Sequence, residues 1–133
     1  MHKPASDSFS VILFSFGYKY GAPRDVNLLC DVRFLANPFH VSELRSFNGL
    51  EKKISDFVLK NDAGEECLAE LQRMAQFMGK QLQQSGKREL RIGIGCTGGH
   101  HRSVAVVEAL TSLLRDDFPG VGRFHRDISK ESH

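Results

Sequence analysis

The segment from Arg91 to Val104 (RIGIGCTGGHHRSV) constrains the fold of this chain more than any other part of the sequence. Apolar residues and small residues run up to Cys96, two glycines follow, and apolar positions at helical spacing begin at Val104. This order predicts a strand, a tight glycine loop and a helix. The free amide groups and the positive dipole end of a helix start attract phosphate and other anions. We therefore expect an anion-binding loop here.

Apolar runs alternate with amphipathic segments along the rest of the chain. The patterns predict strands at 9–16, 26–34, 89–96 and 121–125, and helices at 50–60, 64–85 and 103–115. This alternation indicates an α/β fold, a single three-layer domain in which helices flank a small, mostly parallel sheet of about four strands. Residues 35–49 show no sustained period, so we expect a long loop of the kind that is often functional.

The length of 133 residues suits one domain. We expect a disordered lead at residues 1–8, the folded domain at 9–128 and a tail at 129–133. We see no signal peptide and no run that could span a bilayer. The three cysteines, Cys30, Cys67 and Cys96, form no CxxC pair, which favours a reducing cytoplasm over a disulfide framework or a zinc site. A net charge of +2 does not by itself indicate a nucleic-acid binder.

In a parallel α/β sheet, ligands bind beyond the carboxyl ends of the strands. The glycines after Cys96 allow a close backbone approach, while an arginine and two hydroxyls there can donate to a phosphate. Polar residues follow the other strands as well, which favours a phosphorylated small molecule over a bare anion. The expected binding residues are Thr97, Gly98, Gly99, His101, Arg102, Ser103, Asp31, Arg33 and Asn37.

Other interpretations of the loop can be compared. It is not a Walker A loop, because Gly99 stands where a lysine is required. Cys96, five residues and then Arg102-Ser103 match the signature of cysteine-dependent phosphatases, in which a thiolate attacks phosphorus. In that alternative Cys96 and Arg102 act with Asp31 or Asp127 as the acid. A third interpretation is a structural or oligomerising module.

The histidines do not indicate a metal site. His100 and His101 are adjacent, so at a helix start they point in different directions, and no carboxylate spacing completes a ligand set. We expect no metal and no cofactor. His101 and His125 are interpreted as phosphate donors or RNA contacts, and His40 as an ordinary loop residue.

Four ordered motifs resemble a known family. They are FSFGYKYG at 14–21, DVRFL at 31–35 with Asn37-Pro38, CTGG at 96–99 with His101-Arg102-Ser103, and His125-Arg126. Over nearly its whole length, the chain is similar to the C-terminal domain of the RapZ (YvcJ-type) RNase adapter proteins, a nucleotide-binding family.

The resemblance implies a non-enzymatic, cytoplasmic regulatory domain that senses a phosphorylated amino sugar, such as a glucosamine phosphate. It also implies binding of structured RNA, presentation of that RNA to an RNase, and assembly into homo-oligomers, with no membrane partner. Family members carry an N-terminal P-loop kinase-like domain, which this sequence does not include. By motif match, the sugar phosphate would bind at Thr97, Gly98, Gly99, His101 and Arg102, with Asp31, Arg33 and Asn37 as walls. The candidate RNA contacts are Lys19, His125 and Arg126.

Overall fold

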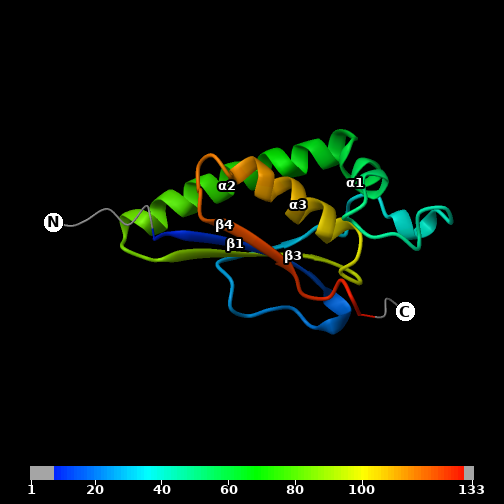
Figure 1. The fold of residues 1–133 in the computed structure, drawn as a ribbon, viewed down its shortest axis with the longest axis horizontal. Helices are drawn as coiled ribbons and strands as arrows, with labels where there is room; N and C mark the ends of the chain where they lie inside the picture. Colours follow the sequence, from blue (N-terminus) through cyan, green and yellow to red (C-terminus); the bar gives the residue numbers. More distant parts are fainter. Residues whose placement is uncertain (1–7, 131–133) are drawn as a thin grey trace.

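A computed structural model describes residues 8–130 of the chain, so residues 1–7 of the lead expected at 1–8 and residues 131–133 of the expected tail lie outside the described part. The described part contains four strands and three α-helices (Figure 1). In chain order these are β1 (Ser10–Gly17), β2 (Leu28–Asp31), α1 (Lys52–Leu59), α2 (Asp62–Gln84), β3 (Glu89–Cys96), α3 (Arg102–Leu114) and β4 (Val121–His125). Two 3-10 turns, η1 (Tyr18–Tyr20) and η2 (Pro38–His40), follow β1 and β2.

The four strands form one sheet in the order β2-β3-β1-β4, and all their pairings are parallel. The predicted α/β class with a small parallel sheet is therefore confirmed. In the register, Gly17 lies opposite Cys96, and Asp31 lies opposite Gly95. The carboxyl ends of the strands therefore meet at one edge of the sheet, and the polar residues that follow them are gathered there.

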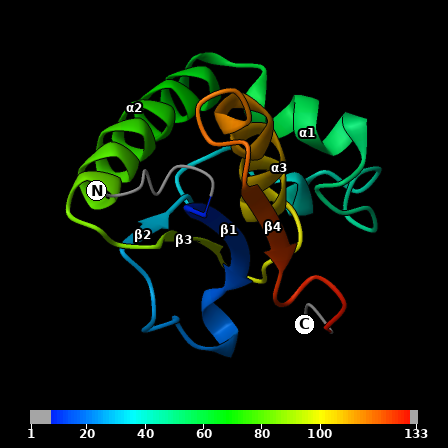
Figure 2. The ribbon, with the colours of Figure 1, turned by 60° about the vertical axis from the view of Figure 1, so that its left-hand side comes forward.

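The three helices cover one face of the sheet, as Figure 1 shows. Figure 2 shows the strands side by side beneath α2 and α3, with β2 and β4 at the two edges. The two helical connections, from β2 to β3 and from β3 to β4, cross the sheet in the same direction, and right-handed crossovers then place their helices on the same face. On the opposite face the outer layer is the connection 18–27, not a helix.

Successive side chains of each strand point to opposite faces of the sheet. Val11 and Leu13 of β1, with Ile92 and Ile94 of β3, pack under the helices in the main hydrophobic cluster. Phe14 and Phe16 are also buried, but they lie outside that cluster. The sheet is therefore apolar on both faces, as parallel sheets usually are.

Two of the element boundaries that differ from the predicted ones are explained by a side-chain hydrogen bond. The second strand ends at Asp31 instead of continuing to 34, because the Asp31 carboxylate accepts hydrogen bonds from the Arg33 amide and guanidinium and turns the chain. The long helix begins at Asp62, two residues before the predicted start, because Asn61 caps it by accepting from the Gly64 amide at 2.8 Å. Within residues 8–130, no helix is both long and apolar enough to cross a membrane.

Candidate functional site

Residues 97–101 form the loop between β3 and α3, and neighbouring segments hold it on two sides. Gly99 has a φ of +78°, in the left-handed region that favours glycine. It packs directly on the end of β1, where a Cβ on Gly99 would lie 2.7 Å from the Gly17 amide nitrogen. On the other side, the Gly49 amide donates to the carbonyl of His100 at 2.7 Å. The loop conformation is therefore fixed by its glycines and by segments distant in sequence.

Helix α3 begins at Arg102 with an open amino end. Its first helical hydrogen bond runs from the Ala105 amide to the His101 carbonyl at 3.0 Å, and the His101 side chain makes no capping hydrogen bond. The Ser103 amide points at Cys96 Sγ, 3.4 Å away. The positive end of the helix dipole is thus directed at the loop and at the cysteine that precedes it.

A cavity of about 270 Å³ lies between this loop and the connection from β2 to α1. The connection from β2 to α1 contributes a phenyl ring and polar side chains to the wall. The glycine loop, with the residues directly before and after it, forms the rest of the wall. The lining residues are Asn37, Phe39, His40, Cys96, Thr97, Gly98, His100, His101 and Arg102.

Arg102 is the most unusual lining residue, because only 6% of it is exposed. Its Nη1 donates to the carbonyls of Arg33 and Leu35, and its Nη2 donates to Thr97 Oγ1 at 3.5 Å. The Nε–H is buried and has no hydrogen-bond partner among the described residues. Burial lowers the pKa of the guanidinium, yet an arginine stays charged. A buried, unsatisfied donor of this kind is costly unless a ligand or water pairs with it.

The two histidines of the loop have different hydrogen-bonding states. His100 Nε2 lies 2.6 Å from the carbonyl of Lys130, and because a carbonyl only accepts, this nitrogen carries the hydrogen. In the neutral ring Nδ1 is then an acceptor, and it is buried without a partner among residues 8–130. His101 Nε2 donates in the same way to the Arg45 carbonyl at 3.2 Å. Burial lowers the pKa of His101, so this ring is neutral at pH 7.

A second cavity, of about 560 Å³, lies on the other side of the same two histidines. His100 and His101 line both cavities. The second cavity is further lined by Arg45 and by Lys130, whose Nζ pairs with Asp127 Oδ1 at 2.7 Å.

The predicted binding residues divide into three groups in the structure. Those that line the smaller cavity are Asn37, Thr97, Gly98, His101 and Arg102. Gly99 and Ser103 are not in the lining: Gly99 packs on β1, and Ser103 is fully buried beside Cys96. Asp31 and Arg33 lie outside the cavity in an ion pair of 2.7 Å, although the Arg33 carbonyl accepts from Arg102.

The residues of the phosphatase alternative are only partly assembled. Cys96 and Arg102 both line the cavity, and Cys96 Sγ contacts Ser103 Oγ at 3.1 Å. Neither candidate acid lines it. The hydrogen bonds from Arg33 hold the pKa of Asp31 below its usual range. Burial alone would raise the pKa of Asp127, but hydrogen bonds from Arg126, Gly17 and Lys130 together lower it. Both carboxyl groups are therefore ionised at pH 7, which does not suit a general acid.

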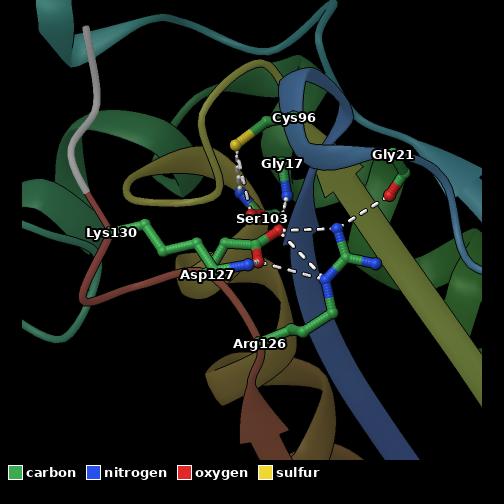
Figure 3. Close-up of polar contacts among 7 residues, drawn as sticks. All are labelled: Gly17, Gly21, Cys96, Ser103, Arg126, Asp127 and Lys130. Atoms are coloured by element: carbon green, nitrogen blue, oxygen red, sulfur yellow. Dashed lines mark hydrogen bonds and ion pairs between the residues drawn. The ribbon is translucent and has the colours of Figure 1, made fainter.

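Two of the three predicted RNA contacts, Lys19 and Arg126, lie by the turn 18–21, and His125 does not. Lys19 is exposed, with Nζ 5.5 Å from the centre of the Tyr20 ring. Arg126 pairs with the buried Asp127 and donates to the Gly21 carbonyl (Figure 3). His125 faces the helices instead. Its Nδ1 lies 2.7 Å from Ser15 Oγ and its Nε2 lies 2.7 Å from Glu108 Oε2.

Several residues of interest had no distinguishing signal in the sequence. Phe39 and His40 enter the cavity wall only because η2 turns the loop there, and only their position directly after Asn37-Pro38 could have pointed to them. The Ser15, His125 and Glu108 side chains form a Ser-His-Glu constellation from three separate elements. Ser15 is fully buried, so no substrate can reach this hydroxyl.

Within residues 8–130, no three His, Cys, Asp or Glu side chains are placed to hold a metal ion.

Comparison with known proteins shows which family the chain belongs to. Residues 9–129 match the family model described as the RapZ C-terminal domain. The chain belongs to the RapZ C-terminal domain family. The expected resemblance is thereby confirmed, and the matched range contains the glycine loop, the start of α3 and both walls of the cavity.

Among the curated relatives are proteins described as nucleotide-binding. One of Saccharopolyspora erythraea is 46% identical over 128 residues, which cover 96% of this chain and 44% of that protein. One of Corynebacterium diphtheriae is 47% identical over 122 residues, covering 90% of this chain and 40% of that protein. One of Clostridium acetobutylicum is 41% identical over 121 residues, covering 91% and 41%. The chain thus spans less than half the length of these relatives.

Proposed function

We propose that this domain binds a phosphorylated small molecule, of the amino-sugar phosphate class, in the 270 Å³ cavity between the loop 97–101 and the connection from β2 to α1. Its role is regulatory and non-enzymatic, as a cytoplasmic module of an RNase adapter. The observation that carries the proposal is the buried Arg102 Nε–H, which has no partner among the described residues and belongs to a residue of the cavity wall.

The cavity offers both kinds of contact that a sugar phosphate needs. Arg102 Nε–H and the open start of α3 supply donors and positive potential for the phosphate. His100 Nδ1 is a buried acceptor, which suits a hydroxyl or ammonium group of the sugar. Drug-sized ligands occupy pockets of roughly 300–1,000 Å³. The smaller volume here favours a ligand of monosaccharide size.

A thermal-shift series tests this proposal, with inorganic phosphate, glucosamine 6-phosphate and unphosphorylated glucosamine as ligands. At a ligand concentration tenfold above Kd, binding adds about 1.4 kcal/mol, which is roughly 4–6 °C in Tm for a domain of this size. We expect shifts with the two phosphate compounds and none with glucosamine. Arg102→Lys keeps the charge but lacks the Nε–H, so its shifts should be largely lost.

Arg73→Lys is the matched control. Arg73 lies on the surface of α2 and pairs with Glu70 at 2.9 Å, far from the cavity wall in sequence and absent from it. This variant should keep the wild-type shifts. Shifts of equal size in wild type and Arg102→Lys would show that the anion binds elsewhere, and the absence of any shift in the wild type would refute the proposed ligand class.

We propose that the domain also binds RNA, through cations beside the turn 18–21. Lys19 and Lys130 lie 5.5 and 4.8 Å from the centre of the Tyr20 ring, and Arg126 lies nearby through its bond to the Gly21 carbonyl. Cations beside an aromatic ring suit a nucleic-acid backbone and its bases. A gel-shift titration with structured RNA at several salt concentrations is the test, since phosphate contacts make affinity fall with salt. A shift that does not respond to salt would contradict phosphate contacts.

Cysteine-dependent phosphatase activity is the second candidate. The contacts of Cys96 Sγ with the Ser103 amide and hydroxyl favour it, as does the presence of both Cys96 and Arg102 in the cavity wall. The ionised states of Asp31 and Asp127 oppose it. An assay with an aryl phosphate distinguishes the two functions: turnover by the wild type that disappears in Cys96→Ser would replace the sensing proposal with an enzymatic one.

A further inference from the structure

The three cysteines have very different surroundings. Cys67 belongs to the hydrophobic core, and burial raises the pKa of its thiol to about 11. Cys30 is half-buried on β2, where burial, and then the charge of Asp31, raise the pKa of its thiol. Both thiols are therefore protonated at neutral pH and react slowly with electrophiles, because the thiolate is the nucleophile.

Cys96 differs from both in its position, because it lies at the end of β3 beside the start of α3. It is only 2% exposed overall, yet it is part of the cavity wall. Its Sγ lies 3.4 Å from the Ser103 amide nitrogen, which donates to it, and 3.1 Å from Ser103 Oγ, as Figure 3 shows. The Ser103 amide that donates to this sulfur belongs to the first turn of α3, and the buried Arg102 lines the same cavity. A small uncharged molecule that enters the cavity can therefore approach a sulfur atom that accepts a hydrogen bond from the start of α3.

Arg102, which lines the same cavity, has a buried Nε–H with no hydrogen-bond partner among the described residues, and this is an independent observation that favours an acceptor at this site. We propose that Cys96 is a site of reversible oxidation by small hydroperoxides, and that the oxygen added to its sulfur occupies the anion pocket. The effect on ligand binding rests on the proposed function of the cavity, whereas the oxidation itself does not.

The reaction is a two-electron transfer to the peroxide. The Cys96 thiol releases its proton to solvent, and the thiolate attacks one oxygen of hydrogen peroxide. An S–O bond forms as the O–O bond breaks, and the leaving hydroxide takes up a proton to become water. The cysteine is oxidised to a sulfenic acid and the peroxide is reduced. Excess small thiol reverses the change by forming a mixed disulfide with release of water, and a second thiol then frees Cys96.

The added oxygen lies where a ligand anion would lie. A sulfenic or sulfenate oxygen on Sγ is an acceptor inside the 270 Å³ cavity and can pair with the Arg102 donor. It therefore competes with a phosphate for the same contact and also takes up volume. Oxidation should close the site to ligands without unfolding the domain.

The test treats the wild-type chain with hydrogen peroxide in the presence of dimedone, which traps sulfenic acids, and follows each cysteine peptide by mass spectrometry. We expect adducts on Cys96 and little or none on Cys30 or Cys67. The Cys30→Ser chain should give the same adduct on Cys96. Preferential labelling of Cys30 or Cys67, or no labelling of Cys96, would overturn the proposal.

A second measurement separates this proposal from the function of the cavity. The phosphate-induced thermal shift is recorded on reduced protein, on peroxide-treated protein and after addition of dithiothreitol. Loss of the shift on oxidation and its return on reduction would support closure of the pocket, while an unchanged shift on fully oxidised Cys96 would contradict it. If the reduced protein shows no shift, the ligand proposal fails, and the adduct on Cys96 alone then decides whether the oxidation site is correct.

Discussion

The lack of a side chain at position 95 determines how the face of the sheet opposite the helices packs. The Phe16 and Tyr18 rings lie edge to face at 4.9 Å between their centres, directly over this glycine. A Cβ at Gly95 would fall on the Phe16 ring and within 2.6 Å of Tyr18 Cε2. The glycine in β3 therefore makes room for two rings carried by β1 and the turn that follows it.

Gly95→Ala should destabilise the domain by about 1–3 kcal/mol, since an added methyl group in a filled space forces rings and backbone apart. The measurement is the free energy of unfolding from urea denaturation. Gly122→Ala on edge strand β4 is the control, because no atom lies within 4 Å of its Cβ position. It should leave stability unchanged or raise it slightly. Equal effects of the two substitutions would contradict the packing argument.

The structural roles of some single residues could be predicted from the sequence, and those of others could not. The glycines of the loop are recognisable because strand, loop and helix patterns adjoin them in the chain. The role of Gly95 is not recognisable, because the rings that cover it come from another strand. Arg102 was predicted to face a phosphate, but its bonds to the carbonyls of Arg33 and Leu35 depend on tertiary structure.

The contacts between secondary-structure elements depend strongly on Asp127, which joins the chain after β4 to the end of β1 by a hydrogen bond. It is fully buried, and its carboxylate accepts from the Gly17 amide at 2.8 Å while pairing with Arg126 and Lys130 (Figure 3). Its Cβ also lies close to Gly99, so the same residue supports the glycine loop from behind. A single carboxylate thus fixes the relative positions of two strand ends and the loop.

Asp127→Asn should lower the free energy of unfolding at pH 7 by about 1–3 kcal/mol, because the negative charge that pairs with Arg126 and Lys130 is removed. In the folded protein the pKa of Asp127 lies below its unfolded value of about 3.9. The stabilisation is therefore complete above that value and is lost as the pH falls through the folded pKa. Denaturation of both proteins between pH 3 and 7 should show a difference that shrinks on acidification.

The matched control for this pH series is Asp25→Asn. The side chain of Asp25 is 74% exposed and pairs with Arg91 at 3.2 Å. Exposed pairs of this kind contribute little, so the change should stay below about 0.5 kcal/mol. A loss for Asp127→Asn that is constant down to pH 3 would indicate a packing defect instead of the loss of a charge.

Element types were largely predictable because their periodicities are local. The last two strands were predicted with the bounds that the structure has, and α1 and α3 within two residues at each end. The turn at Asp31 and the cap at Asn61 moved other boundaries, since each depends on one side-chain hydrogen bond. The Ser15, His125 and Glu108 contacts, which join β1, β4 and α3, were not predictable from any local pattern.

For the whole molecule, the decisive feature is that one cavity has walls from two connections about 60 residues apart in sequence. Alternating strands and helices predicted a parallel sheet, and therefore a common edge for the strand ends. They did not predict the order β2-β3-β1-β4, which places the end of β2 beside the end of β3. That neighbour relation brings the stretch from Asn37 to His40 over the glycine loop.

This arrangement makes a prediction for hydrogen exchange at short labelling times, where local opening dominates. Phosphate should slow exchange in residues 97–103 and also in 37–40, because both segments line the cavity and Arg102 bonds to the backbone at Arg33 and Leu35. The middle of α2 should be unaffected. Potassium chloride at equal ionic strength controls for general screening. Protection confined to 42–48 and 128–130 would instead place the anion in the second cavity, beside Arg45 and Lys130.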